Sequence, residues 1–242
     1  MMRNLLIAAV LLAAATPGLA AAQTGYAGVT YSNTEIDGFD DSDSWGLDGA
    51  VAFAGSGSIV FEVDAAIADN DDSDTAYGLT GHVYHRNDSH LFGGFVGVGD
   101  SSDSTTWTAG LEASKFFTNW TLAGAAFYAN NDDANVDGYG VSTEARFFIT
   151  DNFRLQGGLG WANVDSDFGD DNALQYGVGG EYQFAALPVS VAAGYTRTEL
   201  DEADFEADTF SVGARYNWGG TLRDRDRSGA SQASITSAGF LF

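Results

Sequence analysis

Carboxylates are the side chains with the greatest capacity for chemistry in this sequence, which has 34 Asp and Glu against 10 Lys and Arg. The segment 133–138, followed by Glu144, matches the calcium-loop pattern D-x-[DN]-x-[DN]-G-x5-E. In an EF-hand a helix continues from such a loop. Residues 139–149 instead alternate between apolar and polar side chains, which is typical of a strand. We therefore predict no metal site of this type, although an acidic hairpin could still attract Ca²⁺ loosely.

Histidine and serine are the next candidates for catalysis. The histidines of the sequence are His82, His85 and His90, and the last two flank a turn that also holds Ser89. A His and Ser dyad is conceivable there, but the surrounding residues indicate an ordinary polar turn. The sequence contains no nucleophile elbow or phosphate-binding loop, and with no cysteine it offers no thiolate or disulfide chemistry. We expect neither an enzyme nor a cofactor.

The elements that hold these residues alternate with a period of two. In Thr209–Trp218, the residues at even positions are apolar or aromatic, and those at odd positions are polar or small. This pattern is typical of a β-strand with one apolar and one polar face. Similar segments recur along the chain at 24–34, 44–54, 58–68, 75–85, 90–99, 105–117, 119–129, 138–149, 152–162, 172–184, 188–198 and 207–218. The chain is predicted to be all-β with about twelve strands, ten being the alternative.

Aromatic residues repeat at one spacing within these segments. Phe210 and Trp218 lie eight residues apart with the same parity, a span of roughly 26 Å along a strand. Other segments repeat the spacing, with the pairs Trp45 and Phe53, Tyr139 and Phe147, Phe153 and Trp161, and Tyr176 and Phe184. Two aromatic girdles at the edges of a lipid layer produce such a pattern, whereas a soluble β-sandwich does not require it. The sequence therefore predicts a transmembrane antiparallel up-and-down β-barrel.

Charge is distributed unevenly between the connections. Short turns alternate with longer connections at 35–43, 69–74, 100–104, 130–137, 163–171 and 199–208. The longer ones contain most of the carboxylates and no Lys or Arg. Barrels of this class have short periplasmic turns and longer extracellular loops, so we expect an acidic extracellular rim and both barrel ends in the periplasm. The net charge of −24 excludes nucleic acid as a partner, because phosphates would be repelled.

The parity opposite to the aromatic residues is expected to face the barrel interior. Its polar members, called here the predicted interior set, are Asp48, Glu62, Asp64, His82, Glu112, Glu144, Arg146, Arg154, Gln156, Gln175, Glu181 and Arg215. On the lipid face an Arg or Lys near the bilayer midplane costs about 2–4 kcal/mol, so a wet interior is the expected place for these charges. Carboxylates outnumber arginines in this set, which predicts a preference for cations. Alternatively, Glu112, Glu144 and Glu181 pair with the arginines in a network that conducts little.

The last predicted strand resembles a known assembly signal. Ser211, Gly213, Tyr216 and Trp218 match the polar-x-Gly-x-x-aromatic-x-aromatic pattern that closes outer-membrane β-barrels of Gram-negative bacteria. The resemblance implies recognition by the barrel-assembly machinery. Together with the alternation and girdles over residues 24–218, it makes the chain similar to small porin-type barrels of the outer membrane. Passive diffusion of small hydrophilic solutes, without a cofactor, is what that resemblance implies.

The two ends of the chain differ from the barrel pattern. Residues 1–22 have the features of a secretory signal peptide: Arg3, an apolar run, and small residues before Gln23. The barrel domain is expected at 23–218. Residues 219–242 are expected to form a periplasmic C-terminal tail, which could be flexible, pair with the barrel or occupy its lumen.

The sequence therefore predicts an outer-membrane channel for small solutes, with a leaning toward cations. The alternative is a non-conducting structural or surface barrel whose acidic loops bind divalent cations, lipopolysaccharide or a protein partner. Membrane lipid, lipopolysaccharide and the assembly machinery are the expected partners. The oligomeric state stays open.

Overall fold

A computed structural model describes residues 23–236, apart from 56, 71–72, 102–103, 132, 168 and 202–204. Within these residues there are twelve strands, so the alternative of ten is wrong. Their bounds are β1 Gln23–Ile36, β2 Ser42–Ala54, β3 Ile59–Asn70, β4 Ser73–Arg86, β5 His90–Ser101, β6 Ser104–Phe116, β7 Trp120–Asn131, β8 Val136–Thr150, β9 Phe153–Ser166, β10 Gly169–Gln183, β11 Val189–Leu200 and β12 Phe205–Trp218. The predicted segments coincide with them to within a few residues.

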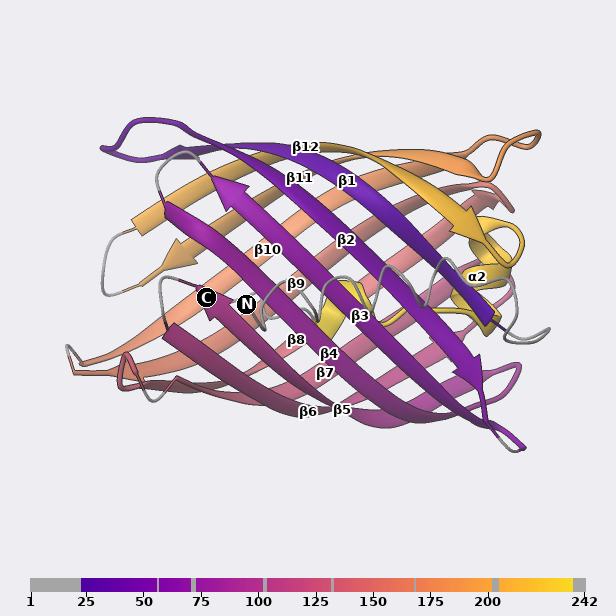
Figure 1. The fold of residues 1–242 in the computed structure, drawn as a ribbon, viewed down its shortest axis with the longest axis horizontal. Coiled ribbons are helices and arrows are strands. Elements are labelled where there is room, and N and C mark those ends of the chain that lie inside the picture. Colours follow the sequence, from indigo (N-terminus) through magenta and orange to yellow (C-terminus); the bar gives the residue numbers. More distant parts are fainter. Residues whose placement is uncertain are drawn as a thin grey trace, which may run out of the picture.

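The strands form one closed barrel in which each pairs antiparallel with its neighbours in sequence (Figure 1). Closure occurs where β1 pairs with both β2 and β12. At this seam Gly213 lies opposite Thr30, and a Cβ on Gly213 would come within 2.9 Å of the Thr30 hydroxyl oxygen. Glycine thus lets the first and last strands approach. The predicted up-and-down barrel is confirmed, and its closure gives each of the twelve described strands a paired neighbour on both sides, as a lipid environment requires.

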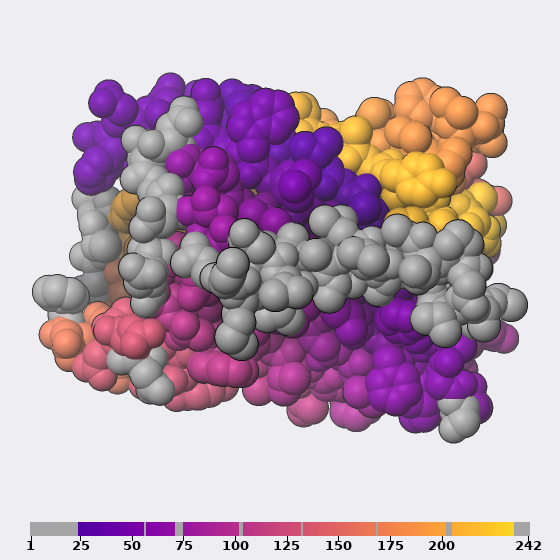
Figure 2. Space-filling model, in the orientation of Figure 1, coloured from indigo at the N-terminus to yellow at the C-terminus, as the bar shows by residue number. Residues whose placement is uncertain are grey.

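The outer surface of the barrel is apolar. Trp45, Val96 and Val178 are each more than 60% exposed, whereas such large apolar side chains would be buried in the core of a soluble protein. Figure 2 shows the outer face of β1 and β2 in indigo and purple, and yellow residues at the right-hand end where β12 leads out of the barrel wall. The clusters of buried apolar residues inside the barrel are small, and one of them consists of Phe95, Ala123 and Ala125. Apolar side chains therefore face outward, toward lipid, and leave a largely polar interior.

Outward aromatic rings contact one another across neighbouring strands near both barrel ends. At the end with the acidic loops, the ring centroids of Tyr31 and Trp45 are 5.1 Å apart. At the end with the short turns, those of Trp120 and Phe147 are 4.5 Å apart. Such contacts are those expected of aromatic girdles on a membrane barrel.

Two short helices follow the last strand, α2 at Leu222–Ser228 and α3 at Ala233–Thr236. Figure 1 shows α2 in yellow at the barrel end that carries the short turns, and the following segment runs back between the barrel walls. Contacts of α3 with β7 and β8 agree with this placement. No helix in the described part of the chain is long and apolar enough to cross a membrane. The predicted signal peptide, residues 1–22, and the final residues 237–242 lie outside the described part.

Candidate site in the barrel interior

All members of the predicted interior set lie on the inward face of the strands. Glu62, Asp64, His82, Glu112, Arg146 and Glu181 are buried. Asp48, Glu144, Arg154, Gln156, Gln175 and Arg215 are partly buried. Their neighbours in sequence point outward, because successive side chains of a strand face opposite sides. Alternation alone was therefore sufficient to find the inward face. Burial does not show whether these residues line a conducting pore, so that role stays a prediction.

One charged group spans the closing seam of the barrel. Arg215 on β12 and Asp48 on β2 both lie beside Gly28 of β1, and their side chains meet at 3.1 Å. A Cβ on Gly28 would lie 2.8 Å from both side chains, so only glycine leaves room for this pair. Arg215 also approaches Glu181 at 3.5 Å, and Arg154 binds Glu181 at 2.9 Å. These charges therefore largely neutralise one another.

The residues of the assembly signal divide between the two faces of β12. Ser211 and Gly213 share the parity of Arg215 and line the interior. Tyr216 is 57% exposed on the outer face, and its ring lies 6.4 Å from that of Trp218. The arrangement fits a terminal strand with an outward aromatic end; its recognition by assembly machinery stays a prediction.

A second charged group is centred on His82. Its Nε2 lies 2.7 Å from Asp64 and its Nδ1 lies 3.1 Å from Glu112. Carboxylate oxygens accept hydrogen bonds, so a doubly donating imidazolium satisfies both neighbours. A third carboxylate, Glu62, is fully buried and accepts from the hydroxyl of Tyr84 at 2.7 Å. The expected pairing of Glu112 with an arginine is therefore wrong; its partner is the histidine.

A third group joins the barrel wall to the C-terminal segment. Arg146 is almost fully buried and pairs with Glu144 on its own strand. It also pairs with Asp226 of α2 at 2.8 Å and donates to Ser234 at 3.0 Å. Thr121 on β7 donates to the same Asp226 at 2.5 Å. Residues far apart in sequence thus hold α2 against the inner wall.

Further contacts extend this docking along the segment. The backbone N–H groups of Ser231 and Gln232 donate to Glu62 at 3.3 and 3.1 Å. Gln232 is fully buried. At the barrel end, Arg223 pairs with Asp151 at 2.6 Å, and Arg227 donates to the carbonyl of Phe117 at 2.6 Å. Of the three alternatives for the tail, the described residues 221–234 therefore adopt the one that occupies the lumen.

Helix α2 has the local features needed to form in so short a segment. Thr221 and Asp224 form a capping box, in which each side chain bonds the other's backbone N–H. Hydrogen bonds from Thr221 lower the pKa of Asp224 and keep its carboxylate charged. Burial lowers the pKa of the Arg225 guanidinium to about 10, so it stays cationic at neutral pH. It donates to Gln183 at 2.6 Å.

Sequence reasoning missed several interior residues. Arg86 is buried at the end of β4, where it donates to Tyr84 and Ser231, both at 3.2 Å. Arg86 lies at an even position, as His82 and Tyr84 do, so alternation places it on the inward face. The predicted strand 75–85 ended one residue before it. Arg225 and Asp226 gave no alternation signal, because they lie on a helix. The capping pattern at Thr221 was the available clue.

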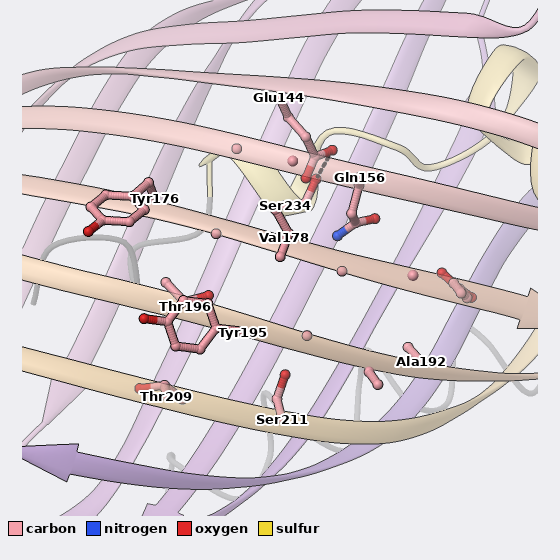
Figure 3. Close-up of a pocket in the computed structure, with 18 of the residues that line it drawn as sticks. Glu144, Gln156, Tyr176, Val178, Ala192, Tyr195, Thr196, Thr209, Ser211 and Ser234 are labelled. Atoms are coloured by element: carbon pink, nitrogen blue, oxygen red, sulfur yellow. Dashed lines mark hydrogen bonds between the residues drawn. The ribbon is translucent and has the colours of Figure 1, made fainter.

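The interior is asymmetric. Large inward side chains fill the side formed by β4–β8; they include Tyr84, Leu91, Phe95, Phe116 and Phe148. The side formed by β9–β12 carries glycine, serine, threonine and glutamine, and leaves a cavity of about 500 Å³ (Figure 3). Figure 3 also shows Ser234 and Glu144 at its border, joined by a hydrogen bond of 3.3 Å. The open space of the lumen therefore follows one wall, with the C-terminal segment beside it.

The calcium-loop pattern does not form a calcium site. Glu144 lies within β8, points inward and binds Arg146, whereas Asp133 lies in the turn before that strand. Among the described residues there is no group of three or more acidic or histidine side chains suited to hold a metal ion.

At the rim, Asp165 lies opposite both Asp137 and Asp170 on neighbouring strands. This rim cluster of Asp137, Asp165 and Asp170 concentrates negative charge at the acidic end.

The turn with two histidines is exposed. Ser89 bonds His90 at 3.0 Å and Ser58 bonds His85 at 2.8 Å. Asn87 accepts from the backbone N–H groups of Ser89 and His90, as in an ordinary Asx turn. The arrangement stabilises a turn, and none of its residues lines the cavity along β9–β12.

Comparisons with known proteins agree with this architecture. The family model described as "Outer membrane protein beta-barrel domain" matches residues 6–217. No curated protein sequence matches the chain. An outer membrane channel of Pseudomonas putida F1 is similar in structure, with a TM-score of 0.64, 11% identity, and coverage of 84% of this chain and 99% of the other. The KdgM porin in complex with disordered oligogalacturonate has a TM-score of 0.56 and 9% identity, with coverage of 79% of this chain and 99% of the other. The translocator domain of autotransporter NalP from Neisseria meningitidis has a TM-score of 0.56 and 12% identity, with coverage of 90% of this chain and 95% of the other.

Proposed function

The chain belongs to the outer membrane protein β-barrel family, and from this premise we propose that it is a channel for passive diffusion of small hydrophilic solutes. The observation that carries the proposal is the polar cavity of about 500 Å³ along β9–β12. Eight-stranded barrels are just filled by their own side chains, and much larger barrels leave an aqueous channel. A barrel of twelve strands lies between these limits. Glycine and small hydroxyl side chains on one wall leave the narrow space that such a passage needs.

The acidic rim, rather than the lumen, is the proposed source of cation preference. Within the lumen, carboxylates are balanced by Arg154, Arg215 and the two cations absent from the predicted set, Arg86 and Arg225. In the rim cluster of Asp137, Asp165 and Asp170, each carboxylate has another carboxylate opposite it on the neighbouring strand. Its negative potential attracts cations to the mouth and is screened within about 10 Å at 0.1 M salt.

Neutralising the rim cluster is expected to weaken ion selectivity without unfolding the barrel. In a planar bilayer with a KCl gradient, the wild-type chain should show cation-selective steps. The triple variant Asp137→Asn, Asp165→Asn, Asp170→Asn should shift the reversal potential toward zero, and most strongly at low salt. It should unfold no more easily than wild type, since opposed like charges destabilise a strand pair. An unchanged reversal potential would place the selectivity elsewhere.

The second candidate is a non-conducting structural or surface barrel. The docking of residues 221–234 inside the lumen favours it, because Arg146 binds Asp226 and Glu62 accepts from the backbone of the same segment there. In that case the acidic loops would bind divalent cations, lipopolysaccharide or a protein partner. Catalysis is not proposed, because the Ser89 and His90 pair lies in an exposed turn.

Conductance of the refolded chain distinguishes the two candidates. The sample is a barrel whose folding is shown by an electrophoretic shift on heating. Discrete current steps in KCl support the channel. A folded barrel that gives no steps at any applied voltage supports the structural alternative and rejects the channel.

A further inference from the structure

The cavity along β9–β12 is lined in part by uncharged polar side chains. On these four strands, its inward uncharged polar side chains are Gln156, Gln175, Thr196, Thr198, Thr209 and Ser211. Figure 3 shows Gln156 on one side of the cavity near Ser234, with Thr196, Thr209 and Ser211 across from it. All six are uncharged, and each can both donate and accept hydrogen bonds. Small side chains and glycines between them leave the polar atoms within reach of a solute.

Gln156 gives the clearest sign that a ligand belongs here. Its Oε1 is buried and has no hydrogen-bond partner among the described residues. A buried acceptor without a partner is destabilising, so a solute hydroxyl that donates to it would be favoured. On β10 and β11, Gln175 donates to Thr198 at 3.1 Å, which leaves the threonine hydroxyl free to donate onward. The cavity therefore offers an acceptor on one wall and a donor on another.

The charged side chains at the cavity border already have partners. Arg154 binds Glu181 at 2.9 Å, Arg215 binds Asp48 at 3.1 Å, and Glu144 binds Arg146. A charged solute would have to break one of these pairs or enter without a counter-charge. An apolar solute would bury the hydroxyl and amide groups without hydrogen bonds. The lining thus disfavours both classes.

We infer that this cavity is a binding subsite for neutral, polyhydroxylated solutes of the small-saccharide class, an inference that rests on the proposed channel function. Such solutes carry hydroxyls that donate and accept, which matches the lining group by group. The volume of about 500 Å³ lies within the range of small-molecule sites, roughly 300–1,000 Å³. Ser234 at the border makes the C-terminal segment part of the subsite wall.

Sugar block of the ion current tests this subsite. The probe is sucrose added to wild-type channels in KCl, and it should interrupt the current in a concentration-dependent way. The double variant Gln156→Leu, Thr198→Val should weaken the block by about tenfold, since it removes two hydrogen-bonding groups. Thr108→Val is the matched control: Thr108 also lies inward and buried, but on β6 and away from this cavity, so its variant should keep the block.

The outcomes separate this inference from the channel proposal. Channels that conduct ions but show no sucrose block would overturn the subsite and leave the channel standing. Block by gluconate as strong as by sucrose would overturn the neutral class. If the folded barrel gives no steps, the channel proposal fails, and equilibrium dialysis of labelled sucrose against the detergent-solubilised barrel decides the subsite. Binding that Gln156→Leu, Thr198→Val weakens supports it, whereas no binding overturns it.

Discussion

Deletion of residues 219–242 should raise the single-channel conductance several-fold. Helix α2 and the residues up to Ser234 occupy lumen space beside the β9–β12 cavity. Without them, the interior near Arg146 and Glu62 would fill with water, which would widen the conducting path. The truncated chain ends at Trp218, where the last strand ends. Planar-bilayer recordings of the two refolded chains measure the difference.

The truncated barrel is expected to fold. Pairing of β1 with β12 extends from Gly25 opposite Trp218 to Ile36 opposite Ala207, so the closing seam does not need the deleted residues. Water would replace the hydrogen bonds that Arg146 and Glu62 lose. A truncated chain that shifts on heating like wild type but conducts no better would show that the segment does not restrict the path.

A single substitution should loosen the segment without removing it. Asp226→Ala removes the carboxylate that binds Arg146 and Thr121. Breaking a buried ion pair in this way costs about 3–5 kcal/mol, and here the loss falls on the docking of α2. Longer or more frequent high-conductance openings are therefore expected.

A disulfide provides the opposite control for the same segment. A Cβ on Gly229 would lie 3.0 Å from the Cβ of Thr24 on β1, shorter than the usual 3.5–4.5 Å of a disulfide, and 2.9 Å from the carbonyl oxygen of Arg225, so a small backbone shift at position 229 is needed to form the bond. The chain has no other cysteine, so Thr24→Cys, Gly229→Cys can form one intramolecular bridge. Combined with Asp226→Ala, the oxidised bridge should restore wild-type conductance, and a reductant should abolish the rescue. Openings that persist in the oxidised form would contradict a role for segment movement.

Replacement of His82 by leucine should give the largest loss of barrel stability. His82 is the donor to both Asp64 and Glu112, and Glu62 lies in the same buried group. Leucine leaves these carboxylates without their shared partner, which costs about 3–5 kcal/mol for a buried pair. Urea unfolding in detergent, followed by tryptophan fluorescence, should show a lower midpoint at a similar slope.

His85→Leu is the matched control, because His85 is exposed on the outward face of the same strand, three residues after His82. The free energy of unfolding of this variant should lie within about 0.5 kcal/mol of the wild-type value, as is usual for surface substitutions. The triple variant Asp64→Leu, His82→Leu, Glu112→Leu removes the charges together and should regain part of the lost stability. Equal stability of His82→Leu and His85→Leu would mean that water reaches the carboxylates and satisfies them.

Alternation was the strongest part of the sequence signal. A strand has a period of two, and a barrel wall in lipid has one apolar and one polar face, so the sequence states directly which side chains face inward. That rule found Glu62, His82 and Arg146 on one face, and it found twelve strands. It missed Arg86 only because the predicted strand stopped one residue early.

Pairing between inward charges could not be read from the same pattern. The sequence suggested that Glu112 meets an arginine, but strand order and register bring it to His82. Arg215 meets Asp48 because closure places β12, β1 and β2 side by side, with Gly28 between the two charged residues. Such neighbours come from the two ends of the chain, and no local rule relates them.

The sequence by itself determined the barrel, the inward face and the acidic rim, because each depends on local alternation or on the composition of a single loop. Only the tertiary structure decided that residues 221–234 fold back into the lumen. Their contacts with Thr121, Arg146 and Glu62 join a helix without strand periodicity to distant strands. Which part of the lumen stays open also depends on those contacts and on where β4–β8 place their large side chains, and therefore on packing in three dimensions.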